Sequence, residues 1–89
     1  MSEFELRLSQ LKLVLDETVK FPSEYLFKFI VPLEEIHQIL FIMQGMEIEQ
    51  KASSSGKYIS VSGKMVMNTS EEIILVYKRA SVIKGIISL

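Results

Sequence analysis

A chain of 89 residues is long enough for one domain with a single modest core, and 48% apolar with 24% charged residues exclude a disordered or fibrous class. Ten basic against 11 acidic residues give a formal net charge of −1, so the composition provides no general attraction to nucleic acid or to an anionic membrane. The absence of cysteine excludes disulfides, thiolate metal sites and cysteine nucleophiles, and it fits a cytoplasmic protein.

The first predicted element lies in an N-terminal extension, residues 1–20. Its apolar residues recur at spacings of four, three and four, which favours a helix, although residues 11, 13 and 15 also alternate as in a strand. The helical stripe consists of Phe4, Leu8, Leu11 and Leu15. Acidic residues near the start do not fit a signal peptide, and no run approaches the ~20 apolar residues that span a bilayer.

Residues 21–89 form the predicted domain, which opens with a strand after Phe21-Pro22. Over residues 24–31 the side chains alternate between a predicted core face and a predicted outer face. The core face comprises Tyr25, Phe27, Phe29 and Val31, and the outer face comprises Leu26, Lys28 and Ile30.

A short helix is predicted from Pro32 until Gly45, with an apolar residue at every third or fourth position. Residues 46–52 then form a charged strand of the kind found at sheet edges, and residues 53–56 form a serine-rich turn in which Gly56 is free to take a positive φ.

The third strand is predicted over residues 57–68 and the second helix after a cap at Thr69 or Ser70. Residues 82–89 are predicted to be the closing strand. The inward residues of these two strands are expected to be Ile59, Val61, Gly63, Met65 and Met67, then Ile83, Gly85, Ile87 and Leu89.

This order of elements predicts an α+β fold: a ferredoxin-like βαββαβ sandwich, with two helices on one face of a four-stranded antiparallel sheet and an N-terminal helical or extended segment added. The other face is too apolar for ordinary solvent-exposed surface. Three interpretations are open: the N-terminal stripe covers this face, two copies associate through it, or the face binds single-stranded RNA.

RNA binding needs aromatic rings on the central strands, and Tyr58 is the one ring predicted there. A basic triad of Lys28, Lys64 and Lys84 is the other feature in its favour, whereas the charge balance disfavours it. A small enzyme is a further alternative. The candidate catalytic residues are the single histidine of the chain, His37, and the pair Glu47 and Glu49. His37 is expected to be an exposed helical residue, and an edge strand explains the two glutamates.

Two segments, "KFPSEYLFKFI" (residues 20–30) and "SSSGKYISVSGKMVMNTSEEIILVYKRASVIKGIISL" (residues 53–89), resemble the YbeD-like family of small bacterial proteins, a domain family of unknown function. The matching motifs are Phe21-Pro22 before Phe27-Lys28, then the serines ending in Gly56 before Tyr58-x-Ser60, and a hydrophobic end at Leu89. The resemblance covers roughly residues 11–89. It implies a fold similar to the ACT regulatory domains, which usually bind amino acids at dimer interfaces.

Taken together, these observations predict a non-enzymatic bacterial regulatory module without a cofactor or metal, which binds a protein partner or a small metabolite and can form a homodimer. The candidate ligand- or partner-binding residues lie on the hairpin and the outer face of the sheet. They are Lys28, Ser54, Gly56, Tyr58, Ser60 and Lys64.

Overall fold

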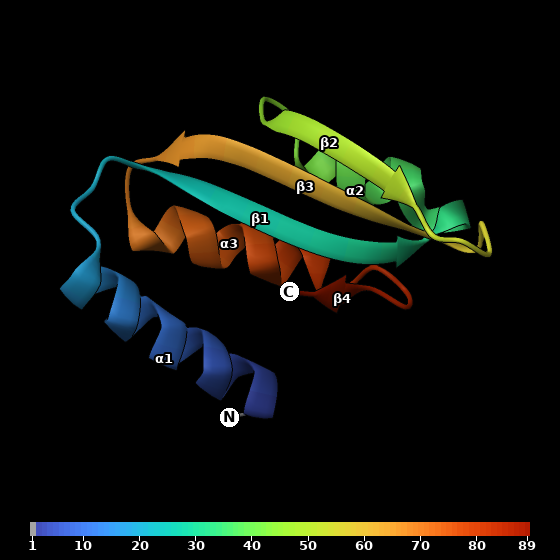
Figure 1. Ribbon diagram of the computed structural model, residues 1–89. Coiled ribbons are helices and arrows are strands. Elements are labelled where there is room, and N and C mark those ends of the chain that lie inside the picture. The colour runs from blue at the N-terminus through green and yellow to red at the C-terminus, as the bar shows by residue number, and fades with distance from the viewer. Residues whose placement is uncertain (1) are drawn as a thin grey trace.

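The computed structural model describes residues 2–89 as an α+β domain, in which three α-helices accompany a four-stranded antiparallel sheet (Figure 1). The elements in chain order are α1 (Glu3–Thr18), β1 (Ser23–Pro32), the 3-10 turn η1 (Leu33–Glu35), α2 (Ile36–Ile42), β2 (Glu47–Ala52), β3 (Tyr58–Met67), α3 (Ser70–Ala80) and β4 (Ile87–Ser88). The strand order is β2-β3-β1-β4, so the two ten-residue strands β3 and β1 occupy the centre.

The core lies against the inner face of the two central strands, as the alternation predicts. Phe27 pairs with Gly63, and Phe29 pairs with Val61. Gly63 leaves the space that the side chain of Met43, at the end of α2, fills; a Cβ on residue 63 would overlap the terminal carbon of Met43. Met65 departs from the prediction, since its side chain is 42% exposed. The fully buried residues are Phe27, Phe29, Val31, Ile39, Met43, Val61, Ile73 and Ala80.

The N-terminal stripe forms a helix, as predicted, but α1 packs against α3 and does not cover the outer face of the sheet (Figure 1). Leu8 and Leu15 are buried in the same core cluster as α3. On the outer face, Leu26 and Val66 remain 60% and 55% exposed. The interpretation in which this segment covers the outer face is therefore wrong.

A polar cluster fixes the C-terminal half of α1 to the start of α3. The hydroxyl of Ser70, which is 1% exposed, donates a hydrogen bond to Asp16 at 2.5 Å. Lys12 donates to the same carboxylate at 2.8 Å and lies 3.8 Å from Glu71. These contacts hold the pKa of Asp16 below its usual value, because the Lys12 hydrogen bond and then the Ser70 hydrogen bond favour the charged form. The cluster thus links two helices that are more than 50 residues apart in sequence.

β2 lies at one edge of the sheet, as its charge pattern predicts. All six of its residues pair with β3, and the turn between the two strands includes Gly56 at φ +75.

The closing strand is much shorter than predicted. Residues 81–85 form turns and a bend, and Gly85 has φ +76. Only Ile87 and Ser88 belong to β4, where they pair with Ile30 and Phe29 of β1. This register places Ser88 on the inner side with Phe29, so Ile87 lies on the outer face and is 50% exposed, contrary to the prediction, whereas Ile86 packs on the core. The turn at Gly85 shifts the alternation by one residue, and such a shift exchanges the two faces.

Candidate binding pocket

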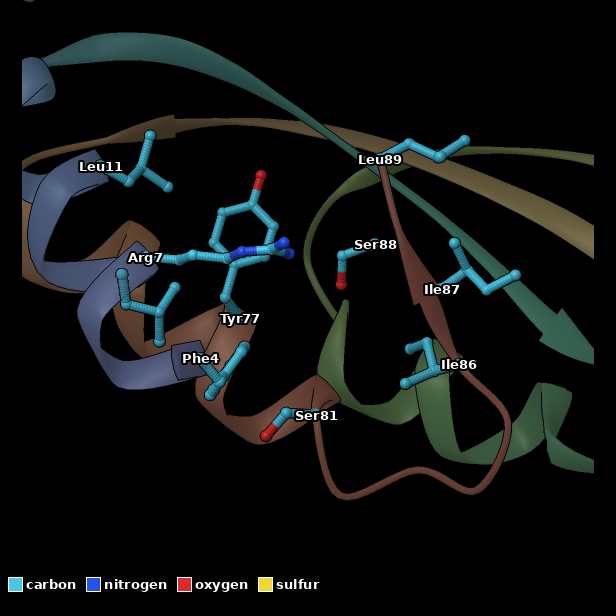
Figure 2. Close-up of a pocket in the computed structure, with 10 residues that line it drawn as sticks. Phe4, Arg7, Leu11, Tyr77, Ser81, Ile86, Ile87, Ser88 and Leu89 are labelled. Atoms are coloured by element: carbon cyan, nitrogen blue, oxygen red, sulfur yellow. The ribbon is translucent and has the colours of Figure 1, made fainter. Parts of the chain in front are cut away.

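A pocket of about 730 Å³ lies where α1, the end of α3 and β4 meet (Figure 2). This volume is within the range of about 300–1,000 Å³ that is typical of sites for small molecules. The lining residues are Phe4, Arg7, Leu8, Leu11, Tyr77, Ser81, Ile86, Ile87, Ser88 and Leu89. Most of them are apolar, so the pocket is suited to removing an apolar group from water.

Tyr77 forms one wall of the pocket and connects it to the central strand. Its ring makes edge-on contacts with Tyr25, Phe27 and Phe29 of β1. The hydroxyl groups of Tyr77 and Tyr25 share a hydrogen bond of 2.9 Å. Burial, followed by that hydrogen bond, raises the pKa of Tyr77 well above its usual value, which further favours the neutral phenol. This wall of the pocket is therefore aromatic and uncharged, and it packs against the rings of β1.

The short β4 gives the pocket its opening. In Figure 2, Ile87 and Leu89 point away from Tyr77, and Ser88 lies on the side of Tyr77. A serine stands where the expected register would have put a large apolar side chain, which leaves space below the strand. The polar groups of the lining are the hydroxyls of Ser81 and Ser88, the phenol and the guanidinium of Arg7. Arg7 also pairs with Glu3 at 3.4 Å, with both side chains mostly exposed.

The side chains of the lining are apolar except for those of Arg7, Tyr77, Ser81 and Ser88. An apolar group can enter beside Tyr77, and an anionic group on the same ligand can reach Arg7 at the rim.

The six residues predicted from the sequence lie outside this pocket. Lys28 and Ser60 line a depression on the outer face, and Lys64 lines a neighbouring one, which shares Glu49 and Ser62 with the first. Gly56 and Tyr58 lie at a third, beside Pro32 at the end of β1. Ser54 is exposed in the turn before β3.

The basic triad expected for RNA binding does not form on the sheet. Lys84 lies in the turn before β4 rather than on a strand. Lys64 is 4.0 Å from the carboxylate of Glu47, its partner in the β2–β3 register. Tyr58 is 45% exposed but stands at the end of the central strands, opposite Pro32. The outer face therefore combines one aromatic ring with charges of both signs.

Among residues 2–89, the structure brings together no group of three or more side chains suited to binding a metal ion. His37 lines a shallow, mostly apolar depression with Phe41 and Val82. Within the same described residues, no helix combines the length and apolar character needed to cross a membrane.

The sequence-based prediction missed the pocket because its walls come from three elements that are distant in the chain. Two signals were present: the α1 stripe needed a partner, and Tyr77 placed a polar hydroxyl on the buried side of α3. Neither signal identifies α3 as the partner of α1 or reveals that β4 is so short.

Comparison with family models, with curated proteins and with solved structures found no match to this chain. The resemblance to the YbeD-like family therefore rests on the sequence motifs alone.

Proposed function

We propose that this protein is a small non-enzymatic binding module of the ferredoxin-like, ACT-like type, which takes up an apolar group of a metabolite or of a protein segment in the pocket between α1, α3 and β4. The strand order β2-β3-β1-β4 supports the fold assignment, because it is the order that two crossovers over one antiparallel sheet produce. The buried side chains of α2 and α3 also belong to one cluster with the inner face of the sheet.

One observation carries the functional proposal: a concavity of about 730 Å³ is lined mostly by apolar side chains, has the ring of Tyr77 in its wall and includes Arg7 among its lining residues. Concave, mostly apolar sites with a few polar groups are typical of ligand binding. The location differs from the six residues predicted from the sequence, so the proposal moves the site from the outer face of the sheet to the opposite side.

The test is a nuclear magnetic resonance titration of the intact, isotopically labelled protein with a pool of the twenty amino acids, followed by single apolar members of the pool. We expect shifts at Leu11, Tyr77 and Ile86, which line the pocket. Line widths in the same spectra distinguish monomer from dimer. Shifts confined to the hairpin around Ser54 and Tyr58, or no shifts with amino acids or with apolar peptides, would contradict the proposed site.

A matched pair of variants makes this test specific. Ser81→Trp introduces a large ring at the pocket lining, whereas Ser54→Trp adds the same ring to an exposed turn. The first variant is expected to weaken binding about tenfold or more, and the second to leave it unchanged. A single-stranded oligonucleotide in a parallel titration tests the RNA alternative, which requires shifts at Tyr58 and Lys28.

A further inference from the structure

β4 covers only part of the β1 edge. Its two residues pair with Ile30 and Phe29, and the amide of Leu89 donates to the carbonyl of Lys28 at 2.9 Å. Figure 1 shows β4 beside the C-terminal part of β1 alone. Residues 23–27 of β1 pair with β3 on one side, and no described strand pairs with them on the other.

The free edge presents backbone groups in a defined pattern. In an antiparallel ladder, every second residue directs both its N–H and its C=O to the same neighbour. Because Lys28 points its carbonyl toward Leu89, Leu26 and Glu24 point theirs to the same edge. Within residues 2–89, Leu26 has no backbone partner on that edge, and the Glu24 carbonyl is approached only by the Ser23 hydroxyl, at 3.5 Å.

The pocket lies next to this edge. Its aromatic wall, Tyr77, is hydrogen-bonded to Tyr25 of β1, and Leu89, where the pairing with β1 stops, is among its lining residues. In a strand that continued the β4 register, alternate residues would lie opposite Phe27 and then Tyr25 of β1. Those residues would point to the inner side, over Tyr77 and Leu11, since Phe27 and Tyr25 point that way.

We propose that the β1 edge at residues 24–27, together with the pocket, is a docking site for an extended peptide segment of a partner protein, which runs antiparallel to β1 and inserts apolar side chains at alternate positions. This inference rests on the proposed pocket and specifies its occupant. Main-chain hydrogen bonds to an exposed sheet edge and pockets for alternate side chains are the two components of strand-addition recognition.

A single extended segment fits this site better than a second copy of the chain. α1 lines the pocket opposite β4, with Phe4, Arg7 and Leu11, so it borders the edge along which a partner would pair. A second copy that paired β1 with β1 would bring its own α1 to the same flank. A peptide strand has no such helix, and it would be held between the β1 edge and α1.

The experiment begins with a random nonapeptide display library selected on the intact protein. Enriched peptides are expected to alternate apolar and polar residues. On binding, the Leu26 amide should become protected from hydrogen exchange, and the signals of Leu11 and Tyr77 should shift. Failure to enrich any alternating peptide, or enrichment without protection of Leu26, would overturn the proposal.

Backbone methylation of a bound peptide tests the hydrogen bonds directly. Methylation of the amide that faces Leu26 should weaken binding about tenfold, whereas methylation of the next amide, which points away from β1, should have little effect. Equal effects at both positions would overturn strand addition. If the pocket signals still shift in that case, the proposed pocket stands; if no apolar amino acid or peptide moves them, the pocket fails as well.

Two protein variants provide the matched control. Leu26→Pro removes an N–H that β3 does not use and fills its place with the ring, whereas Leu26→Ala retains the backbone. Binding should be lost in the first variant and retained in the second. Their unfolding midpoints in urea establish whether both are folded, and the methylated peptides decide the question if Leu26→Pro is not.

Discussion

The two edges of the sheet are built in different ways. At one edge, β2 pairs with β3 over all six of its residues, and every second side chain along it carries a charge at Glu47, Glu49 and Lys51. At the other edge, β4 has two residues, and β1 extends beyond it with its backbone groups free. The first edge carries charges that discourage pairing with other chains, and its backbone is paired along the whole of β2. The second edge also carries charges, at Glu24 and Lys28, but part of its backbone is unpaired and it lies next to an apolar pocket.

The two edges therefore differ in whether another strand can pair with them. A charged edge is protected by its own side chains, so it needs no other element. The β1–β4 edge depends on α1 and on the turn before β4 for its shape, because these determine which part of β1 stays open. Variants that disturb α1 or the turn should therefore have larger effects than variants in the β2 charges.

The largest expected effect is from Leu15→Ala in α1. Leu15 is 5% exposed in the core beside α3, so its truncation should lower the free energy of unfolding by about 2–3 kcal/mol, as for other buried leucines. Leu13→Ala is the control, because Leu13 is 62% exposed and its loss should change stability by less than about 0.5 kcal/mol. Urea unfolding measures both. Equal midpoints for the two variants would show that α1 is not part of the core.

The next effect compares two glycines with nearly the same backbone angle at the two edges. Gly85 has φ +76, and a Cβ there would lie 2.8 Å from Cγ of Pro32. Gly56 has φ +75 with open space around it. Gly56→Ala should cost about 1 kcal/mol for the left-handed conformation alone. Gly85→Ala should cost about 2 kcal/mol, because the Pro32 ring at the end of β1 must also move. Similar losses by urea unfolding would contradict this difference between the two turns.

The sequence predicts much of the fold because the periodicity of the two central segments is clear. The alternation around Phe27 and Phe29 assigns β1 to the centre of the core, and the charges of residues 47–51 assign β2 to an edge. The prediction for the closing strand was wrong because Ile83, Gly85, Ile87 and Leu89 alternate as the inner face of one continuous strand would, whereas the chain turns at Gly85, which has φ +76. The pocket could not be predicted, since it requires the tertiary contact of α1 with α3.

A smaller effect is expected at the polar cluster that joins α1 to α3. Ser70→Ala removes the hydrogen bond to Asp16 and should lower the free energy of unfolding by about 1 kcal/mol. Because the pKa of Asp16 is lower in the folded state, its contribution is complete above the usual carboxyl value and is lost as the pH falls through the lowered one. Unfolding midpoints measured at decreasing pH should show this loss in the wild-type protein. The Asp16→Asn variant has no titrating group at this position, so its unfolding midpoints should lack that part of the pH dependence. If the variant and the wild-type protein have the same pH profile, the cluster does not hold α1.

The smallest expected effect is from Glu47→Gln at the β2 edge. Its carboxylate lies 4.0 Å from Nζ of Lys64, and the two side chains are 79% and 44% exposed, so solvent screens the pair. Stability should change by less than about 0.5 kcal/mol. The value of these charges is instead that they oppose pairing, so replacing both Glu47 and Glu49 with Val should cause self-association at high concentration without destabilising the fold. Sedimentation velocity over a range of concentrations measures this. A monomeric double variant would show that the charges do not protect β2, and that some other feature distinguishes it from the open β1 edge.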